Sequence, residues 1–145
     1  MKELARRLTL AIYHIDQSYS RNEKYRRKSR AELNIMYALD DGLPHSQAEL
    51  CRDWMVPKTT MNSIIRRWEQ AGYVVQTKIP GKRREMEITL TESGRDHVRT
   101  SLDPIYRAEK TALEKTVGTY GDGFIDALQD FSEYIRAAFE EENTR

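Results

Sequence analysis

Three consecutive cations, Lys82, Arg83 and Arg84, follow a Pro80-Gly81 pair in a chain whose formal net charge is only +1. Proline followed by glycine is typical of a tight turn, so these side chains should stand on an exposed tip. Lysine and arginine at such a tip bind phosphate groups and release counterions from nucleic acid, although many cationic tips are only solvated loops. The residues around the tip decide between these two interpretations.

A second set of polar side chains shares one face of a helix that we predict from about Lys58 to Ala71. At about 100° per residue, the apolar face of that helix consists of Met61, Ile64, Ile65 and Trp68. The other face offers donors and acceptors that suit base edges in a major groove, although a polar outer face is also the commonest helix surface. The candidate contacts are Lys58, Thr59, Thr60, Asn62, Ser63, Arg66 and Arg67.

The elements that position both sets are predicted in the order helix, tight turn, helix and hairpin. Ser46 and Glu49 form a capping-box pattern at the start of a short helix, and Pro57 ends that segment and starts the next. The runs "YVVQTKI" and "REMEITL" on the two sides of the cationic tip are rich in β-branched and apolar residues and predict two strands. This order is that of a winged helix-turn-helix, so the fold class is mainly α with a small β-hairpin wing.

Two further helices lie around this region. Ser29 is a candidate N-cap for a short helix that stops at Asp41-Gly42. Thr91 can cap a longer helix after the hairpin, for which we expect a kink or an interruption near Pro104.

The two ends of the chain carry amphipathic helices, from about Lys2 to Glu23 and from about Gly123 to Glu141. Their apolar stripes are Leu4, Leu8, Ile12, Ile15 and Tyr19, and Phe124, Leu128, Phe131, Ile135 and Phe139. A small winged domain cannot cover stripes of this length, so we expect a homodimer. The alternative is that the two end helices pack only on each other within one chain.

Charge is unevenly distributed along the sequence. Residues 1–45 and 46–91 each carry a net charge of +3, whereas residues 92–145 carry −5. The stretch from Arg52 to Arg84 holds eight lysines and arginines against two acids. An acidic C-terminal segment therefore conceals a basic island, and this island, rather than the net charge, bears on a nucleic-acid partner.

The sequence contains no residue pattern that is typical of metal binding or of catalysis. His14, His45 and His97 are far apart and form no metal-binding pattern, so neither a metal nor another cofactor is expected. The single cysteine, Cys51, is expected to be a small hydrophobe, with redox sensing as the alternative. No phosphate loop, nucleophile elbow or carboxylate pair indicates an enzyme. Without a leader or an apolar run long enough for a membrane, the protein is expected to be cytoplasmic.

The chain resembles the multiple-antibiotic-resistance-regulator (MarR) family of bacterial transcriptional regulators over nearly its whole length. The resemblance lies in "SQAELCRDWMVPKTTMNSIIRRWEQAGYVVQ", in the wing strand "KRREMEITLTESG" and in its family-like L-T-E-x-G start of the next helix. It implies a single MarR-like chain over residues 1–145, with a DNA-binding winged helix-turn-helix at 29–91 and dimerisation helices at 1–23 and 92–145. It also implies a repressor whose dimer binds a pseudo-palindromic duplex DNA operator.

The resemblance adds two expectations and leaves one alternative. Arg83 takes the wing-tip arginine position, while Gly81 stands where family wings commonly carry an acidic residue. Relatives of this type bind small aromatic or anionic effectors between the dimer helices and the winged domain, and the tyrosines that could line such a pocket are Tyr13, Tyr37, Tyr106 and Tyr120. The alternative function is a winged-helix protein-interaction module that binds no DNA.

Overall fold

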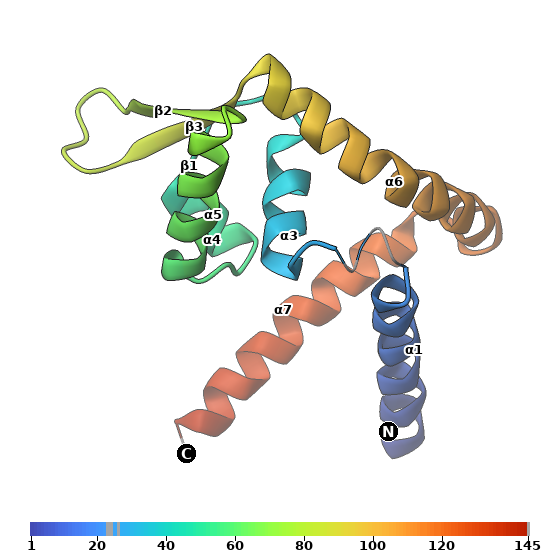
Figure 1. Ribbon diagram of the computed structural model, residues 1–145. Coiled ribbons are helices and arrows are strands. Elements are labelled where there is room, and N and C mark those ends of the chain that lie inside the picture. The colour runs from blue at the N-terminus through green and yellow to red at the C-terminus, as the bar shows by residue number, and fades with distance from the viewer. Residues whose placement is uncertain (23–24, 26, 145) are drawn as a thin grey trace. The chain divides into compact units, whose positions relative to one another are not determined.

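The computed structural model describes residues 1–22, 25 and 27–144. By internal contacts the chain divides into two compact units, Met1–Ile105 and Tyr106–Arg145. The helices of the described residues are α1 (Lys2–Ser20), α3 (Arg30–Leu39), α4 (Gln47–Asp53), α5 (Lys58–Gln70), α6 (Glu92–Tyr120) and α7 (Gly123–Asn143). The strands are β1 (His45–Ser46), β2 (Val74–Lys78) and β3 (Met86–Leu90) (Figure 1).

Short-range hydrogen bonds start these helices where the sequence predicts them. The Ser29 hydroxyl accepts the backbone N–H of Glu32 at 3.1 Å at the start of α3. The capping box of α4 is confirmed, because the Glu49 N–H donates to Ser46 Oγ at 3.1 Å and the Ser46 N–H donates to Glu49 Oε2 at 2.9 Å. That N–H lowers the pKa of the Glu49 carboxyl. Each cap satisfies backbone donors that a helix start otherwise leaves unpaired.

The predicted hairpin is confirmed and is part of a three-stranded antiparallel sheet with the order β1-β3-β2. In its register Val74 pairs with Leu90 and Lys78 with Met86. The additional strand β1 pairs His45 with Ile88. Two residues are too few to carry an alternating pattern, so no sequence signal predicted β1.

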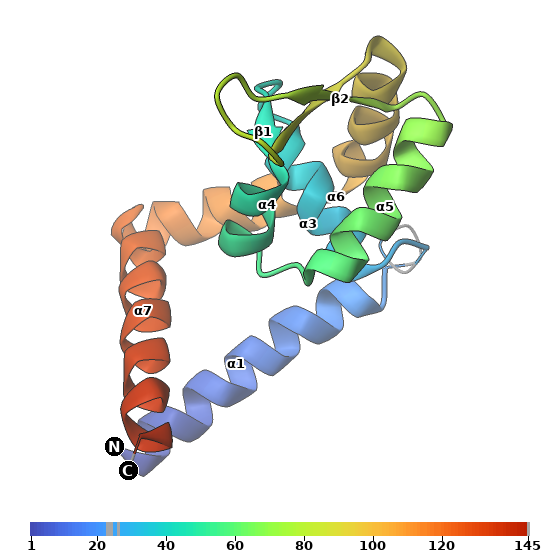
Figure 2. The ribbon, with the colours of Figure 1, turned by 90° about the vertical axis from the view of Figure 1, so that its left-hand side faces the viewer.

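The core of the first unit lies between α3, α4, α5, the sheet and the first half of α6 (Figure 2). The four apolar residues predicted for the inner face of α5 are all buried, and Trp68 is only 1% exposed. Ile35, Leu39 and Ile88 are completely buried beside them. The removal of these apolar side chains from water is the main force that holds α5 in place.

Two predicted boundaries differ from the structure. Of the kink or interruption expected near Pro104, the interruption is wrong, because α6 runs as one helix from Glu92 to Tyr120 with Pro104 inside it, and the kink stays a prediction. Leu102 and Ile105 are both buried on the two sides of this proline, and their packing outweighs the hydrogen bond that proline removes. The predicted end of the first helix at Glu23 lies outside the described residues, and α1 ends at Ser20.

Neither terminal helix contains a buried residue, although each has an apolar face. On α1, side chains such as Leu4, Leu10 and Ile15 are more than half exposed. On α7, the exposed large apolar side chains include Phe131 and Phe139. Among the described helices, none has the length and apolar character that a membrane crossing requires.

Candidate nucleic-acid interface

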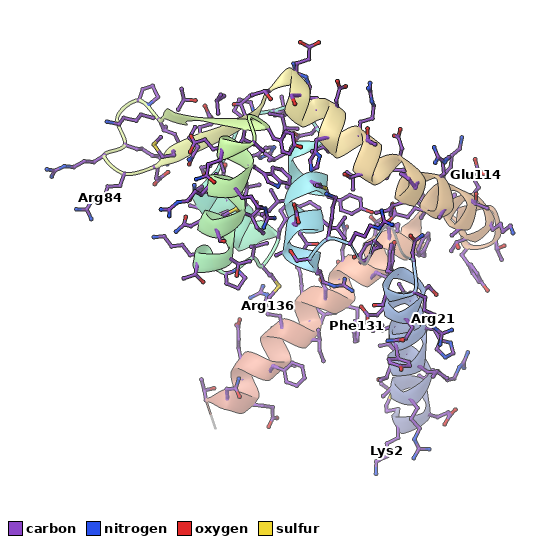
Figure 3. All side chains as sticks on the ribbon, in the orientation of Figure 1. Lys2, Arg21, Arg84, Glu114, Phe131 and Arg136 are labelled. Carbon is purple, nitrogen blue, oxygen red and sulfur yellow. The ribbon has the colours of Figure 1, made fainter. Side chains whose placement is uncertain are left out.

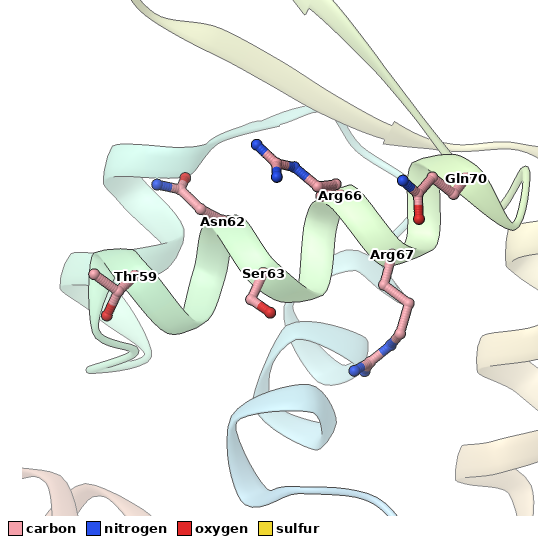
Figure 4. A pocket seen from close by; sticks show the side chains of 6 residues that line it. All are labelled: Thr59, Asn62, Ser63, Arg66, Arg67 and Gln70. Atoms are coloured by element: carbon pink, nitrogen blue, oxygen red, sulfur yellow. The ribbon is translucent and has the colours of Figure 1, made fainter.

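The outward face of α5 forms one continuous polar surface. Six of its residues line a shallow depression of about 420 Å³: Thr59, Asn62, Ser63, Arg66, Arg67 and Gln70 (Figure 4). Of the other predicted contacts on this helix, Lys58 is exposed and Thr60 is half-buried. The surface combines hydroxyl, amide and guanidinium groups on a rigid helix, the chemistry that reads base edges and phosphates.

The two arginines of α5 lie in different environments. Arg66 extends to the side of α5 opposite Arg67 and has no ion pair with another described residue (Figure 4). Arg67 points toward α3, where its Nη2 lies 3.0 Å from Oε1 of Glu32 (Figure 4). The sequence alone did not indicate this pair, because its partners are far apart in the chain.

A short turn between α4 and α5 sets the direction of α5. Met55 adopts a left-handed conformation at φ 51°, and the next residue, Val56, is buried with 3% exposure. The Asn34 side-chain amide donates to the Trp54 carbonyl at 3.3 Å and ties the turn to α3. Bonded at Trp54 and buried at Val56, the turn presents α5 as a fixed element.

The wing tip is built around a β-turn. The N–H of Lys82 donates to the carbonyl of Ile79 at 3.1 Å, and Gly81 at the third position has φ +79°. Proline at the second position and glycine with positive φ at the third are the requirements of a type II turn. An acidic side chain at position 81 would strain this turn, which explains why glycine stands there.

The three cations of the tip are not equivalent. Lys82 Nζ lies 2.7 Å from Oε2 of Glu85, and this carboxylate raises the pKa of the lysine. Neither Arg83 nor Arg84 forms an ion pair with another described residue, and Arg84 projects from the tip into solvent (Figure 3). The two arginines are therefore the cations that a phosphate or a minor groove would meet first.

A hydrogen-bonded chain connects the wing to both helices of the helix-turn-helix. The Gln47 amide at the start of α4 donates to Oε1 of Gln76 on β2 at 2.8 Å. The Gln76 amide donates in turn to Oε2 of Glu69 near the end of α5 at 3.1 Å. These two hydrogen bonds link α4, β2 and α5 to one another. Sequence periodicity does not indicate such a connection.

A cleft of about 210 Å³ lies where α4, the start of α5 and the wing meet. Its lining includes Lys58 from α5, Arg84 from the wing and Cys51 from α4, which is the one cysteine of the sequence. Burial raises the pKa of the Cys51 thiol, so the thiol is largely protonated near neutral pH.

The four tyrosines proposed for an effector pocket belong to different parts of the chain. Tyr37 packs against the core and stacks on Trp54, with ring centroids 6.2 Å apart. Tyr13 lies exposed on α1. Tyr106 and Tyr120 belong to the second unit. Nothing in the structure tests a site shared by the two units, so the pocket stays a prediction.

Comparisons with known proteins agree with this geometry. The sequence model of the MarR family matches residues 29–85, from the start of α3 to the wing tip. The HTH-type transcriptional regulator PecS of Dickeya dadantii (strain 3937) is 32% identical over 109 residues, which cover 66% of this chain and 65% of PecS. Together these matches support a MarR-family winged-helix regulator. The alignment spans just under two thirds of the curated relative, so the activity and partners of PecS are not carried over from it.

Solved structures of MarR-like proteins share the fold. NMB1585, a MarR family regulator from Neisseria meningitidis, has a TM-score of 0.66 at 18% identity, covering 97% of this chain and 96% of its own. Overoxidised AbfR bound to DNA, of Staphylococcus epidermidis, has a TM-score of 0.65 at 16% identity, covering 95% and 96%. NadR in complex with 4-hydroxyphenylacetate has a TM-score of 0.61 at 18% identity, covering 88% of both chains. At these identities the likeness concerns the fold alone.

Proposed function

We propose that this chain is a homodimeric regulator of the MarR family that binds duplex DNA sequence-specifically, and that it represses transcription until a small effector binds. The outward face of α5 enters the major groove, and the wing follows the backbone or the minor groove. The observation that carries this proposal is the combination of an exposed polar face on α5 with Arg83 and Arg84 on the adjoining wing, which form no ion pair with another described residue. AbfR, a protein of the same fold, has been solved on DNA.

Dimerisation follows from the uncovered apolar faces of the terminal helices. Neither α1 nor α7 buries a side chain, and an exposed apolar stripe of this length is typical of an interface. A two-fold dimer would place two α5 helices on successive major grooves of a pseudo-palindromic operator. We assign residues 1–23 and 92–145 to this dimer and residues 29–91 to DNA.

The effector part of the proposal rests on a ligand of a structural neighbour. NadR, which has the same fold, has been solved with 4-hydroxyphenylacetate, a small aromatic anion. A similar ligand would release DNA by favouring a spacing of the two α5 helices that does not match successive grooves. The tyrosines at 13, 37, 106 and 120 are the candidates for its contacts.

A mobility-shift assay across a salt series tests the DNA-binding part. The native protein should retard a duplex from the region upstream of its own gene, and the affinity should fall steeply as salt rises. We expect alanine at Arg83 or Arg84 to lower the affinity about tenfold and the salt slope by about one each, because each removes one phosphate contact. Lys82→Ala is the matched control, since Lys82 is already paired with Glu85. Its effect should be smaller.

Two results would contradict this expectation. DNA binding whose affinity does not change with salt would contradict the proposed phosphate contacts. Equal losses for Lys82→Ala and the two arginine variants would show that the pairing with Glu85 does not distinguish the three cations.

Cys51 provides an independent test of where DNA lies. Because this is the one cysteine of the sequence and it lines the cleft with Lys58 and Arg84, bound DNA should cover it. We expect duplex DNA to slow alkylation of Cys51 by N-ethylmaleimide about tenfold, on the premise that cleft phosphates bridge the two cations. Mass spectrometry of the intact protein over time measures the rate. Glutathione in the same tube controls for reagent loss, and high salt should abolish the protection.

A further inference from the structure

The Glu32 carboxylate joins the core of the winged unit to its DNA-facing helix. Its Oε1 accepts the indole N–H of Trp68 at 3.0 Å, and the same oxygen lies 3.0 Å from Nη2 of Arg67. Trp68 is buried, whereas the Arg67 side chain is 58% exposed and that of Glu32 only 13%. One nearly buried carboxylate therefore holds an arginine that would otherwise be free to turn toward DNA.

We infer that Glu32 restrains Arg67 in the DNA-free protein, and that DNA binding transfers the Arg67 guanidinium from this carboxylate to a DNA phosphate. This inference rests on the proposed DNA-binding function. It assigns a role to Glu32, which is not itself a proposed DNA contact. Glu32 acts through Arg67 and is a positioning residue. Its removal should tighten DNA binding.

The transfer is feasible because the carboxylate keeps other partners when Arg67 leaves. The Trp68 N–H remains bonded to it from the core. Glu32 also lies in the first turn of α3, where the unpaired N–H groups of the helix favour a negative charge. Without these partners a nearly buried carboxylate would resist losing its cation.

The other half of the exchange is equally favourable. More than half of the Arg67 side chain is in solvent, so its ion pair with Glu32 is partly screened and of limited strength. DNA phosphates, with their condensed counterions, compete well for such a group. Arg66 makes no comparable pair among the described residues, so the restraint acts on one arginine of α5 and leaves its neighbour available.

The test compares Glu32→Gln with Glu92→Gln on a duplex recovered from a random-sequence pool by selection with the native protein. Glutamine keeps an oxygen for the Trp68 N–H but loses the charge that holds Arg67. Glu92 is exposed in the first turn of α6, so its replacement makes the same change of net charge without touching Arg67. We expect Glu32→Gln to bind about two- to fivefold more tightly than Glu92→Gln, the range of a surface ion pair.

Arg67→Ala supplies a second measurement that does not depend on the folding of the Glu32 variant. If the guanidinium moves to a phosphate, this variant should lose about one unit of the salt slope, and adding Glu32→Gln to it should give no further gain. The inference would be overturned if Glu32→Gln and Glu92→Gln bound DNA equally well, or if Arg67→Ala left the salt slope of DNA binding unchanged. In either case, DNA binding by the native protein would leave the proposed function intact. If the native protein binds no duplex, the proposed function itself fails.

Discussion

Phe131→Asp is expected to convert the native dimer into a monomer and to weaken operator binding about a hundredfold or more. Phe131 lies on the apolar face of α7, which buries no residue within the chain, and it is 38% exposed. A carboxylate there would have to lose its hydration in the interface without a partner. A monomer would also lose the gain in effective concentration that binding two half-sites provides.

Sedimentation velocity and a titration on the same operator measure the two effects. Ala137→Asp is the matched control, because residue 137 is exposed on the opposite, polar face of the same helix. It should remain dimeric and bind DNA as the native protein does. If the Phe131→Asp protein keeps its helical circular dichroism and stays dimeric, α7 is not part of the dimer interface.

Gly94→Ala is expected to destabilise the protein by about 3 kcal/mol, at the upper end of what overpacking a core costs. A Cβ at position 94 would lie 1.9 Å from the carbonyl oxygen of Tyr73 and 2.8 Å from its carbon. That oxygen cannot withdraw, because it accepts the Thr91 N–H at 2.9 Å. The glycine of the L-T-E-x-G motif thus allows α6 to begin directly against the end of the turn after α5.

Urea unfolding at one fixed protein concentration measures this loss, since the stability of a dimer depends on concentration. Gly118→Ala in the same helix is the control, because its Cβ would meet no atom within 4 Å. It should stabilise the protein by up to about 1 kcal/mol through helix propensity. Similar midpoints for the two variants would contradict the close approach at Gly94.

The local elements of the winged unit could be predicted because their signals span only a few residues. The capping pair Ser46 and Glu49 is separated by three positions, and the buried face of α5 repeats within two turns. The cationic tip was recognisable from Pro80-Gly81 and the residues after it. Such signals did not predict the two-residue strand β1 or the uninterrupted course of α6 through Pro104, because long-range pairing and core packing decided both.

The amino-acid sequence by itself determined which side chains face outward on α5 and which cations stand on the wing, because helical periodicity and turn chemistry are local. Only the tertiary structure decided which of these cations are restrained. Lys82 is held by Glu85 across the turn, and Arg67 is held by Glu32, which lies 35 positions earlier in the sequence. Glu85 is only three positions from Lys82, but the approach of Glu32 to Arg67 depends on how the core packs, and no local pattern encodes it.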